Sequence, residues 1–182
     1  MKSSVFPLVL TALCAAIIAV LAQVSIPLPL VPITGQTLAI GLVVTILGLK
    51  YGTYSVLLYI LLGAIGLPVF QGFSGGLSVI VGPTGGYIVG FVPCALVIGY
   101  YLEKTSFTFI HALVANLLGM IVTLTFGALW LKVVADLTWT GALISGIAPF
   151  VVVGIIKAAM AAWAGVIIRN RLLQAKLLQP IV

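Results

Sequence analysis

The sequence predicts an all-α integral membrane protein from its composition, its hydropathy and the pattern of its apolar runs. Of its 182 residues, 63% are hydrophobic and only 5% are charged, whereas soluble domains carry about 25% charged residues. The mean hydropathy is +1.40. The runs are apolar throughout, while the strands of a membrane β-barrel alternate in polarity, and open strands leave backbone groups unsatisfied in lipid. The lipid bilayer is therefore the expected environment.

Six apolar stretches predict a compact six-helix bundle that forms one transmembrane domain over residues 1–182. Each span needs about 20 residues, so the length leaves no room for a separate soluble module. The second stretch is short, and we expect it to be tilted or lengthened by the preceding loop. The helices are expected at about 5–22, 38–49, 52–70, 85–102, 107–134 and 148–168.

The basic residues predict that both chain termini lie in the cytoplasm of a plasma-membrane protein, because short cytoplasmic loops are enriched in Lys and Arg. On the opposite side only Lys132 lies near a loop, and Lys157 lies inside the last helix. The loops 24–37, 71–86 and 135–147 are then external. The cytoplasmic set consists of Lys2, Lys50, Lys104, Arg169, Arg171 and Lys176.

The first apolar run has an alternative interpretation. Lys2 followed by an apolar segment and the small residues before Gln23 could form a cleavable signal peptide. Cleavage would leave five helices in the same orientation, so the charge pattern does not decide between the two. The length of the run favours a retained helix.

The stretch GPTGGY at 82–87 is unusually rich in glycine for so apolar a chain. Glycine allows positive φ and close approach of a guest to the backbone, and proline restricts the chain. An uncharged loop with N–H groups, carbonyls, a hydroxyl and an aromatic ring suits a small molecule better than a bare ion. A tight turn explains any single glycine better, but the three outer loops together favour binding. The candidates here are Phe73, Gly75, Gly76, Pro83, Thr84, Gly85 and Tyr87.

The stretch VPITGQT at 31–37 adds Thr34 and Gln36 after a proline-spaced segment. Each proline restricts its own φ and disfavours helix in the residue before it, so this segment is predicted to be extended and stiff. It is expected to form a lid or a wall of the site. A rigid external connector is the alternative.

Two polar residues within predicted spans are further candidates. Lys157 lies about nine residues, or about 14 Å, into the last helix, where a cation is costly and points to function. No predicted span contains an Asp or Glu in its interior, so a ligand carboxylate or a strong carbonyl acceptor is the expected partner unless Asp136 of the external loop folds inward to pair with Lys157. Snorkelling to the outer interface is the alternative. Asn116 also needs a partner, which is either the ligand or a neighbouring helix.

A series of motifs runs through most of the chain. They are TALCAA (11–16), VPITGQT (31–37), SVLLYILLGAIGLPVF (55–70), GFSGG (72–76), GPTGGYIVGF (82–91) and APF (148–150) followed by Lys157. In this order and spacing the chain resembles the BioY proteins, the biotin-specific substrate-binding (S) components of energy-coupling-factor (ECF) vitamin importers.

The resemblance implies a six-helix S-component fold that captures biotin from outside, is not an enzyme and needs no cofactor. The expected partners are a transmembrane coupling protein and two ABC-type ATPases, and the S component is thought to topple in the membrane. In this family a small-residue face on the first helix meets the coupling protein, which assigns that role to Ala12 and Ala16, with Ala15 and Ala19 as the alternative pair. Packing within the protein is the alternative reading of these alanines.

One position departs from the family pattern. The usual last helix resembles PF-x-PGD-x-x-K, whereas this chain reads PFVVVGIIK and has Gly154 in place of the Asp. If that Asp accepts hydrogen bonds from the ureido ring, this protein needs another acceptor, such as Asn116, Asp136 or a loop carbonyl. Without such an acceptor, the protein would bind biotin more weakly, or would bind a related ligand or a different vitamin instead.

Other functions fit the sequence less well. Ser145 and Lys157 are too far apart on one helix to act together as an intramembrane catalyst, and a secondary carrier would want an acid in the core. Cys14, Cys94 and His111 are not clustered as metal ligands are. No metal and no nucleic acid is expected as a partner, and the sequence leaves open whether the chain works alone, as a homo-oligomer or with a coupling module.

Overall fold

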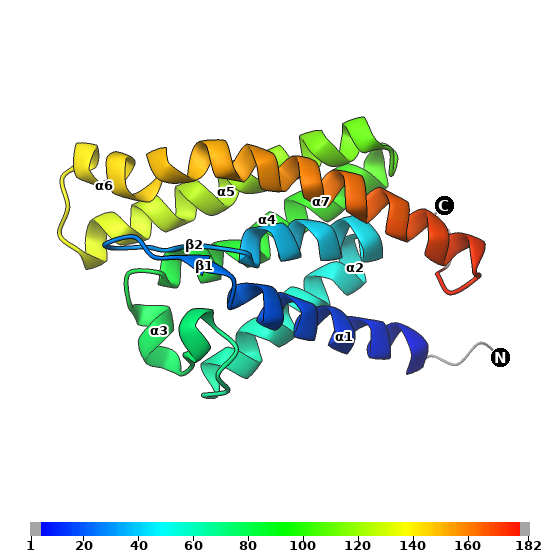
Figure 1. Ribbon diagram of the computed structural model, residues 1–182, viewed down its shortest axis with the longest axis horizontal. Coiled ribbons are helices and arrows are strands. Elements are labelled where there is room, and N and C mark those ends of the chain that lie inside the picture. The colour runs from blue at the N-terminus through cyan, green and yellow to red at the C-terminus, as the bar shows by residue number, and fades with distance from the viewer. Residues whose placement is uncertain (1–4, 179–182) are drawn as a thin grey trace.

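The computed structural model describes residues 5–178, so Lys2 lies outside the described part. The chain is mostly helical (Figure 1), which confirms the all-α class. The elements are α1 (Val5–Ala22), β1 (Ser25–Ile26), β2 (Ile33–Thr34), α2 (Gln36–Ala64), the 3-10 turn η1 (Gln71–Phe73), α3 (Leu77–Val81), α4 (Gly85–Lys104), α5 (Phe109–Val134), α6 (Trp139–Gly146) and α7 (Ala148–Gln174).

Within residues 5–178, five helical segments are long and apolar enough to cross a membrane. The second and third predicted helices form the single element α2, which has non-helical backbone at Gly48 (φ 80°, ψ −171°). The third predicted helix also ends six residues too late. Gly66 (φ 104°) follows the last turn of α2 and donates its N–H to the Gly63 carbonyl, which closes the helix as left-handed glycines commonly do.

Two polar side chains form hydrogen bonds with backbone groups on either side of the break at Gly48. Arg169 on α7 donates to the Ile46 carbonyl at 2.5 Å. On the other side of the break, the Leu49 N–H donates to Glu103 of α4 at 2.8 Å. The guanidinium of Arg169, whose residue is 3% exposed, also lies 3.6 Å from the ring centroid of Phe107. In lipid every backbone group needs such a partner, so the break is stabilised by tertiary contacts.

Glycines allow α4 and α5 to pack closely. A Cβ at Gly86 would lie 2.1 Å from the Cβ of Trp130, and one at Gly127 would lie 2.2 Å from the ring of Tyr87. Both positions therefore need the smallest residue for the helices to approach at this distance. This pair forms one side of the space in which the candidate site lies.

The first helix lies at the periphery of the bundle, where it packs mainly on α2 (Figure 1). Ala12 and Ala16 are exposed on its outer side. Ala15, which the alternative small-residue pair would use, faces inward and belongs to the core. The buried residues of α1 are Thr11, Cys14, Ala15, Ile18 and Ala22.

Two short helices, α3 and α6, occupy segments that the sequence predicts as loops. The Thr138 hydroxyl caps α6 by accepting from the Gly141 N–H at 3.1 Å. Figure 1 shows α3, α6 and the β1–β2 hairpin toward one end of the molecule, while α1 begins and α7 ends toward the other. The specialised loops thus gather at the end opposite to the chain termini.

Candidate ligand-binding site

A small hairpin brings the VPITGQT segment to the start of α2. Strands β1 and β2 pair antiparallel with Ser25 opposite Thr34. Gly35 follows them and donates its N–H to the Val24 carbonyl at 2.8 Å. A Cβ at Gly35 would lie 2.3 Å from the Leu21 carbonyl oxygen, so this glycine permits a close approach to the end of α1. The segment is therefore fixed in place as a wall, as the sequence predicts for a stiff stretch.

A cavity lies between this hairpin, the residue 70–74 turn and helices α2, α4, α5 and α7. Its volume is about 960 Å³ including the space open to solvent at its mouth. The aromatic side chains in its lining are those of Phe70, Tyr87, Phe91 and Phe150. The polar ones are those of Thr34, Gln36, Thr37, Gln71, Ser74, Thr84, Asn116, Thr123 and Lys157. A mostly apolar lining with a few polar groups is typical of small-molecule sites.

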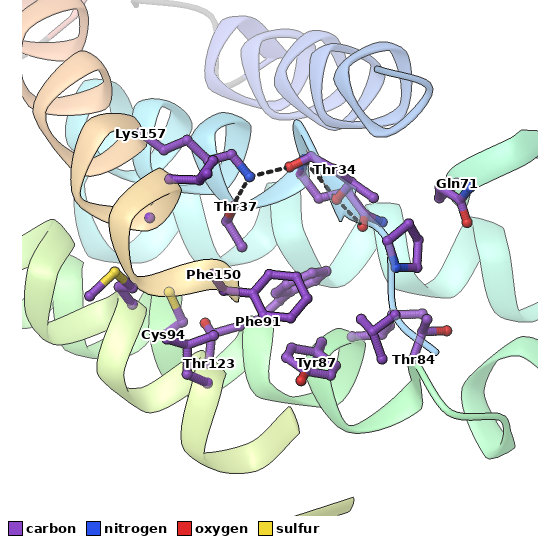
Figure 2. Close-up of a pocket in the computed structure, with 18 of the residues that line it drawn as sticks. Thr34, Thr37, Gln71, Thr84, Tyr87, Phe91, Cys94, Thr123, Phe150 and Lys157 are labelled. Carbon is purple, nitrogen blue, oxygen red and sulfur yellow. Dashed lines mark hydrogen bonds between the residues drawn. The ribbon is translucent and has the colours of Figure 1, made fainter. Parts of the chain in front are cut away.

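Lys157 is the single Lys, Arg, Asp or Glu among the described lining residues. Figure 2 shows its side chain pointing from α7 toward Thr34 and Thr37. The ammonium nitrogen donates to the Thr34 carbonyl at 2.6 Å and to the Thr37 hydroxyl at 3.3 Å. These acceptors are neutral, and Asp136 lies in the turn between α5 and α6 rather than in the lining. The site thus presents a partly buried cation without a protein carboxylate beside it.

Gln36 is held in one orientation by both ends of its amide. Its Oε1 accepts from the Thr34 hydroxyl at 2.8 Å, and its Nε2 donates to the Tyr59 hydroxyl at 2.5 Å. Tyr59 is fully buried and meets Phe70 edge to face, with ring centroids 5.5 Å apart. Buried amides with both ends engaged are rigid, so Gln36 contributes a fixed polar wall.

Asn116 connects α5 to α2. Its Nδ2 donates to the Thr45 hydroxyl at 3.1 Å and to the Ala112 carbonyl at 2.8 Å. A Cβ at Gly41 would lie 2.1 Å from Asn116 Oδ1. The absence of a side chain at Gly41 therefore leaves room on α2 for the Asn116 amide. The N–H groups of the Asn116 amide thus bond to neighbouring helical residues, as the alternative interpretation expects. The residue also lines the cavity.

The glycine-rich loop contributes less to the lining than the sequence predicts. Thr84 and Tyr87 line the cavity, and the Tyr87 hydroxyl donates to the Gly146 carbonyl at 2.6 Å. Phe73 is 72% exposed. A Cβ at Gly85 would lie 1.7 Å from the Ile80 carbonyl oxygen, which makes this glycine a packing residue. The candidates outside the lining are Phe73, Gly75, Gly76, Pro83 and Gly85.

Several lining residues escape sequence reasoning because they are apolar and lie within spans. Phe91 follows Tyr87 by one helical turn, and Phe150 precedes Lys157 by about two. Helical spacing from the polar candidates would have found both. Figure 2 shows Phe91, Phe150 and Tyr87 arranged around one space.

Gly154, where the family pattern has an Asp, also lines the cavity. A Cβ at this position would lie 2.4 Å from the sulfur of Met120 on α5. The thioether thus fills the space beside α7 that a side chain at 154 would enter. Lys157 follows one turn later on the same helix, so this part of the site offers a cation and a polarisable apolar group.

Comparison with known proteins agrees with the resemblance in the sequence. Residues 1–174 match the model of the BioY family. The chain is 44% identical over 157 residues to "Biotin transporter BioY2" of Lactococcus lactis subsp. cremoris (strain MG1363), covering 86% of each chain.

A second relative and a solved structure extend this agreement. The chain is 44% identical over 148 residues to "Biotin transporter BioY" of Thermotoga maritima, covering 81% of this chain and 86% of that protein. It is also similar to a crystal structure of the S-component for biotin from an ECF-type ABC transporter. The TM-score is 0.86 at 32% identity, with 93% of this chain and 95% of the other covered. The predicted family is confirmed, and the chain belongs to the BioY family.

Proposed function

We propose that this protein takes up biotin as the S subunit of an ECF-type vitamin importer. Its relatives over most of its length are biotin transporters, and its fold is that of an S-component for biotin. The observation that carries the proposal within the molecule is Lys157, a cation on the wall of a largely apolar cavity and without a protein carboxylate in that lining.

The lining matches the chemistry of biotin, which combines a carboxylate, an aliphatic chain and a bicyclic ureido head. An ammonium group has three donors, and two of those of Lys157 are directed to Thr34 and Thr37. The third is available to a ligand carboxylate or ureido oxygen. Phe70, Phe91 and other rings bury the apolar part. Ligand contacts are assigned to Thr34, Gln36, Thr84, Tyr87, Asn116 and Lys157.

The membrane arrangement is part of the same proposal. The protein forms one domain that crosses the plasma membrane six times, with α2 crossing as two segments joined at Gly48. Both termini lie in the cytoplasm, and the cavity opens to the outside. The positions of the hairpin, α3 and α6 at the end opposite to the termini support this orientation (Figure 1). Lys50, Lys104, Arg169 and Arg171 supply the basic residues of the cytoplasmic side.

The partners follow from the ECF-type context of the solved relative. A transmembrane coupling protein and two ABC-type ATPases would drive delivery of biotin. The exposed alanines Ala12 and Ala16 on α1 offer a surface where another helix could approach closely. The chain supplies capture and needs no cofactor.

Equilibrium binding of biotin to the purified chain in detergent, measured by calorimetry, tests the proposal. Thiamine, riboflavin and biotin methyl ester serve as comparison ligands. Tight binding of biotin with loss for the ester supports both the ligand and a carboxylate partner. Well-folded protein that ignores biotin but binds another vitamin would reassign the ligand and identify Gly154 and Met120 as the place to look for the change.

A further inference from the structure

We propose that Gln23, at the end of α1, is a positioning residue for the ligand site: it holds the turn at residues 70–74 that forms one wall of the cavity. The inference rests on the proposed function and adds a residue outside the lining. Phe70, Gln71 and Ser74 of this turn line the cavity. Gln23 itself does not.

The carboxamide of Gln23 contacts the turn from both of its ends. Its Oε1 accepts from the Phe73 N–H at 2.9 Å. Its Nε2 donates to the Phe70 carbonyl at 3.1 Å and lies 3.4 Å from the Val69 carbonyl. The same nitrogen donates to the Ala19 carbonyl of α1 at 3.0 Å, which fixes the side chain relative to its own helix. One side chain therefore joins α1 to a segment about 50 residues away.

The turn has a backbone that needs such support. Gly72 has φ 70° and Phe73 has φ 55°. For a residue with a Cβ, the left-handed region is unfavourable, so surrounding contacts must stabilise it. The turn closes through the Phe70 N–H, which donates to the Ser74 carbonyl at 3.0 Å. Gln23 supplies hydrogen bonds to the backbone of this turn from outside it.

The turn connects directly to the polar part of the site. The ring of Phe70 is 1% exposed and meets Tyr59 edge to face. Tyr59 accepts from Gln36, and Gln36 in turn accepts from the Thr34 hydroxyl. A shift of Phe70 would therefore change both the apolar wall and the orientation of Gln36. This gives Gln23 a route to the ligand through contiguous contacts.

The test compares Gln23→Leu with the wild type in the full-length chain, purified in detergent. Leu keeps most of the volume and removes both hydrogen-bonding ends. We expect biotin to dissociate about tenfold faster, as the loss of hydrogen bonds to the turn implies. Thr11→Val is the control, because Thr11 is a buried polar residue of α1 whose hydroxyl donates to the Pro7 carbonyl of the same helix rather than to the turn. Its dissociation rate should match the wild type.

A rescue variant separates positioning from general stability. Phe73→Gly in the Gln23→Leu background removes a side chain that is exposed and outside the lining, and glycine adopts left-handed backbone without a Cβ clash. The double variant should recover a dissociation rate close to that of the wild type. Thermal unfolding midpoints of all variants show whether any change in binding merely follows a loss of fold.

Amide hydrogen exchange of the ligand-free protein makes the outcome independent of biotin. Residues 70–76 should exchange faster in Gln23→Leu than in the wild type, while α5 should not change. Unchanged exchange in the turn overturns the inference, and so does faster exchange with an unchanged dissociation rate. If the wild type binds no biotin, the proposed function fails, and the exchange result alone decides whether Gln23 holds this wall.

Discussion

The ammonium nitrogen of Lys157 lies 2.6 Å from the carbonyl oxygen of Thr34, although the two residues are 123 positions apart in the chain. This contact joins α7 to the hairpin that precedes α2. A neutral acceptor therefore already positions the ammonium group at the cavity wall. A ligand anion can bind to it without a change in the conformation of the Lys157 side chain. Such preorganisation reduces the entropic cost of binding.

Removal of the cation should weaken binding while leaving the fold intact. For Lys157→Met we expect biotin affinity to fall by about 1.5–3 kcal/mol, the usual contribution of a hydrogen bond to a charged group. Calorimetry measures the change. Lys132→Met is the control, because Lys132 lies over the Trp139 ring at 4.9 Å and is outside the cavity lining. Equal affinities for wild type and Lys157→Met would make Lys157 an interfacial lysine.

The pair formed by Gly154 and Met120 should control the size of the site. Gly154→Ala places a Cβ where the Met120 sulfur lies and should displace that side chain into the cavity. Overpacking of this kind costs about 1–3 kcal/mol, and we expect it to appear as weaker biotin binding. Met120→Ala in the same background should restore part of the affinity. A double variant that binds no better than Gly154→Ala alone would contradict this account.

The Tyr59 hydroxyl should matter through Gln36. In Tyr59→Phe the buried Nε2 of Gln36 loses its acceptor, which should cost about 1–3 kcal/mol of stability. Thermal unfolding in detergent measures the effect, and biotin affinity should also fall because Gln36 lines the cavity. Tyr54→Phe, on the same helix but 46% exposed, provides the comparison. Equal destabilisation by the two variants would argue against a special role for the Gln36 contact.

Arg169 should stabilise the protein more than its neighbour Arg171 does. Arg169→Met leaves the Ile46 carbonyl without its donor and removes the positive charge near Glu103. We expect a loss of about 1.5–3 kcal/mol, the usual contribution of a hydrogen bond to a charged group. Arg171 is exposed at the end of α7, so Arg171→Met should change the unfolding midpoint little. Similar midpoints for the two variants would show that the break does not depend on Arg169.

The sequence predicts best those features that have a local physical cause. Lys157 is identifiable because an isolated cation in an apolar span is costly, and the stiffness predicted for residues 26–32 follows from the three prolines in that stretch. The glycines of the 71–86 segment were ambiguous, since absence of a Cβ serves ligand approach and helix packing equally well. The structure uses Gly85 for packing. Thr84 and Tyr87 line the cavity.

Features with a tertiary cause were not predictable in the same way. The Lys50 region resembles a loop between two helices, yet in α2 the helix resumes directly after Gly48. The side chains that bond to the α2 backbone at the break come from α4 and α7, more than 50 residues later in the chain. Gln23 likewise gave no signal, because a polar residue after an apolar run is what any helix end shows. Its contacts depend on a turn about 50 residues further along the chain.

The break in α2 bears on how the two parts of this helix can move relative to each other. An interrupted helix in lipid needs partners for its freed backbone groups, and water is one of the groups that can supply them. Here Arg169 and Glu103 occupy those positions, and the Phe107 ring covers the guanidinium. The part of α2 before the break is therefore tied to α7 and the part after it to α4, so a rotation of one part against the other would have to break a hydrogen bond to a charged side chain.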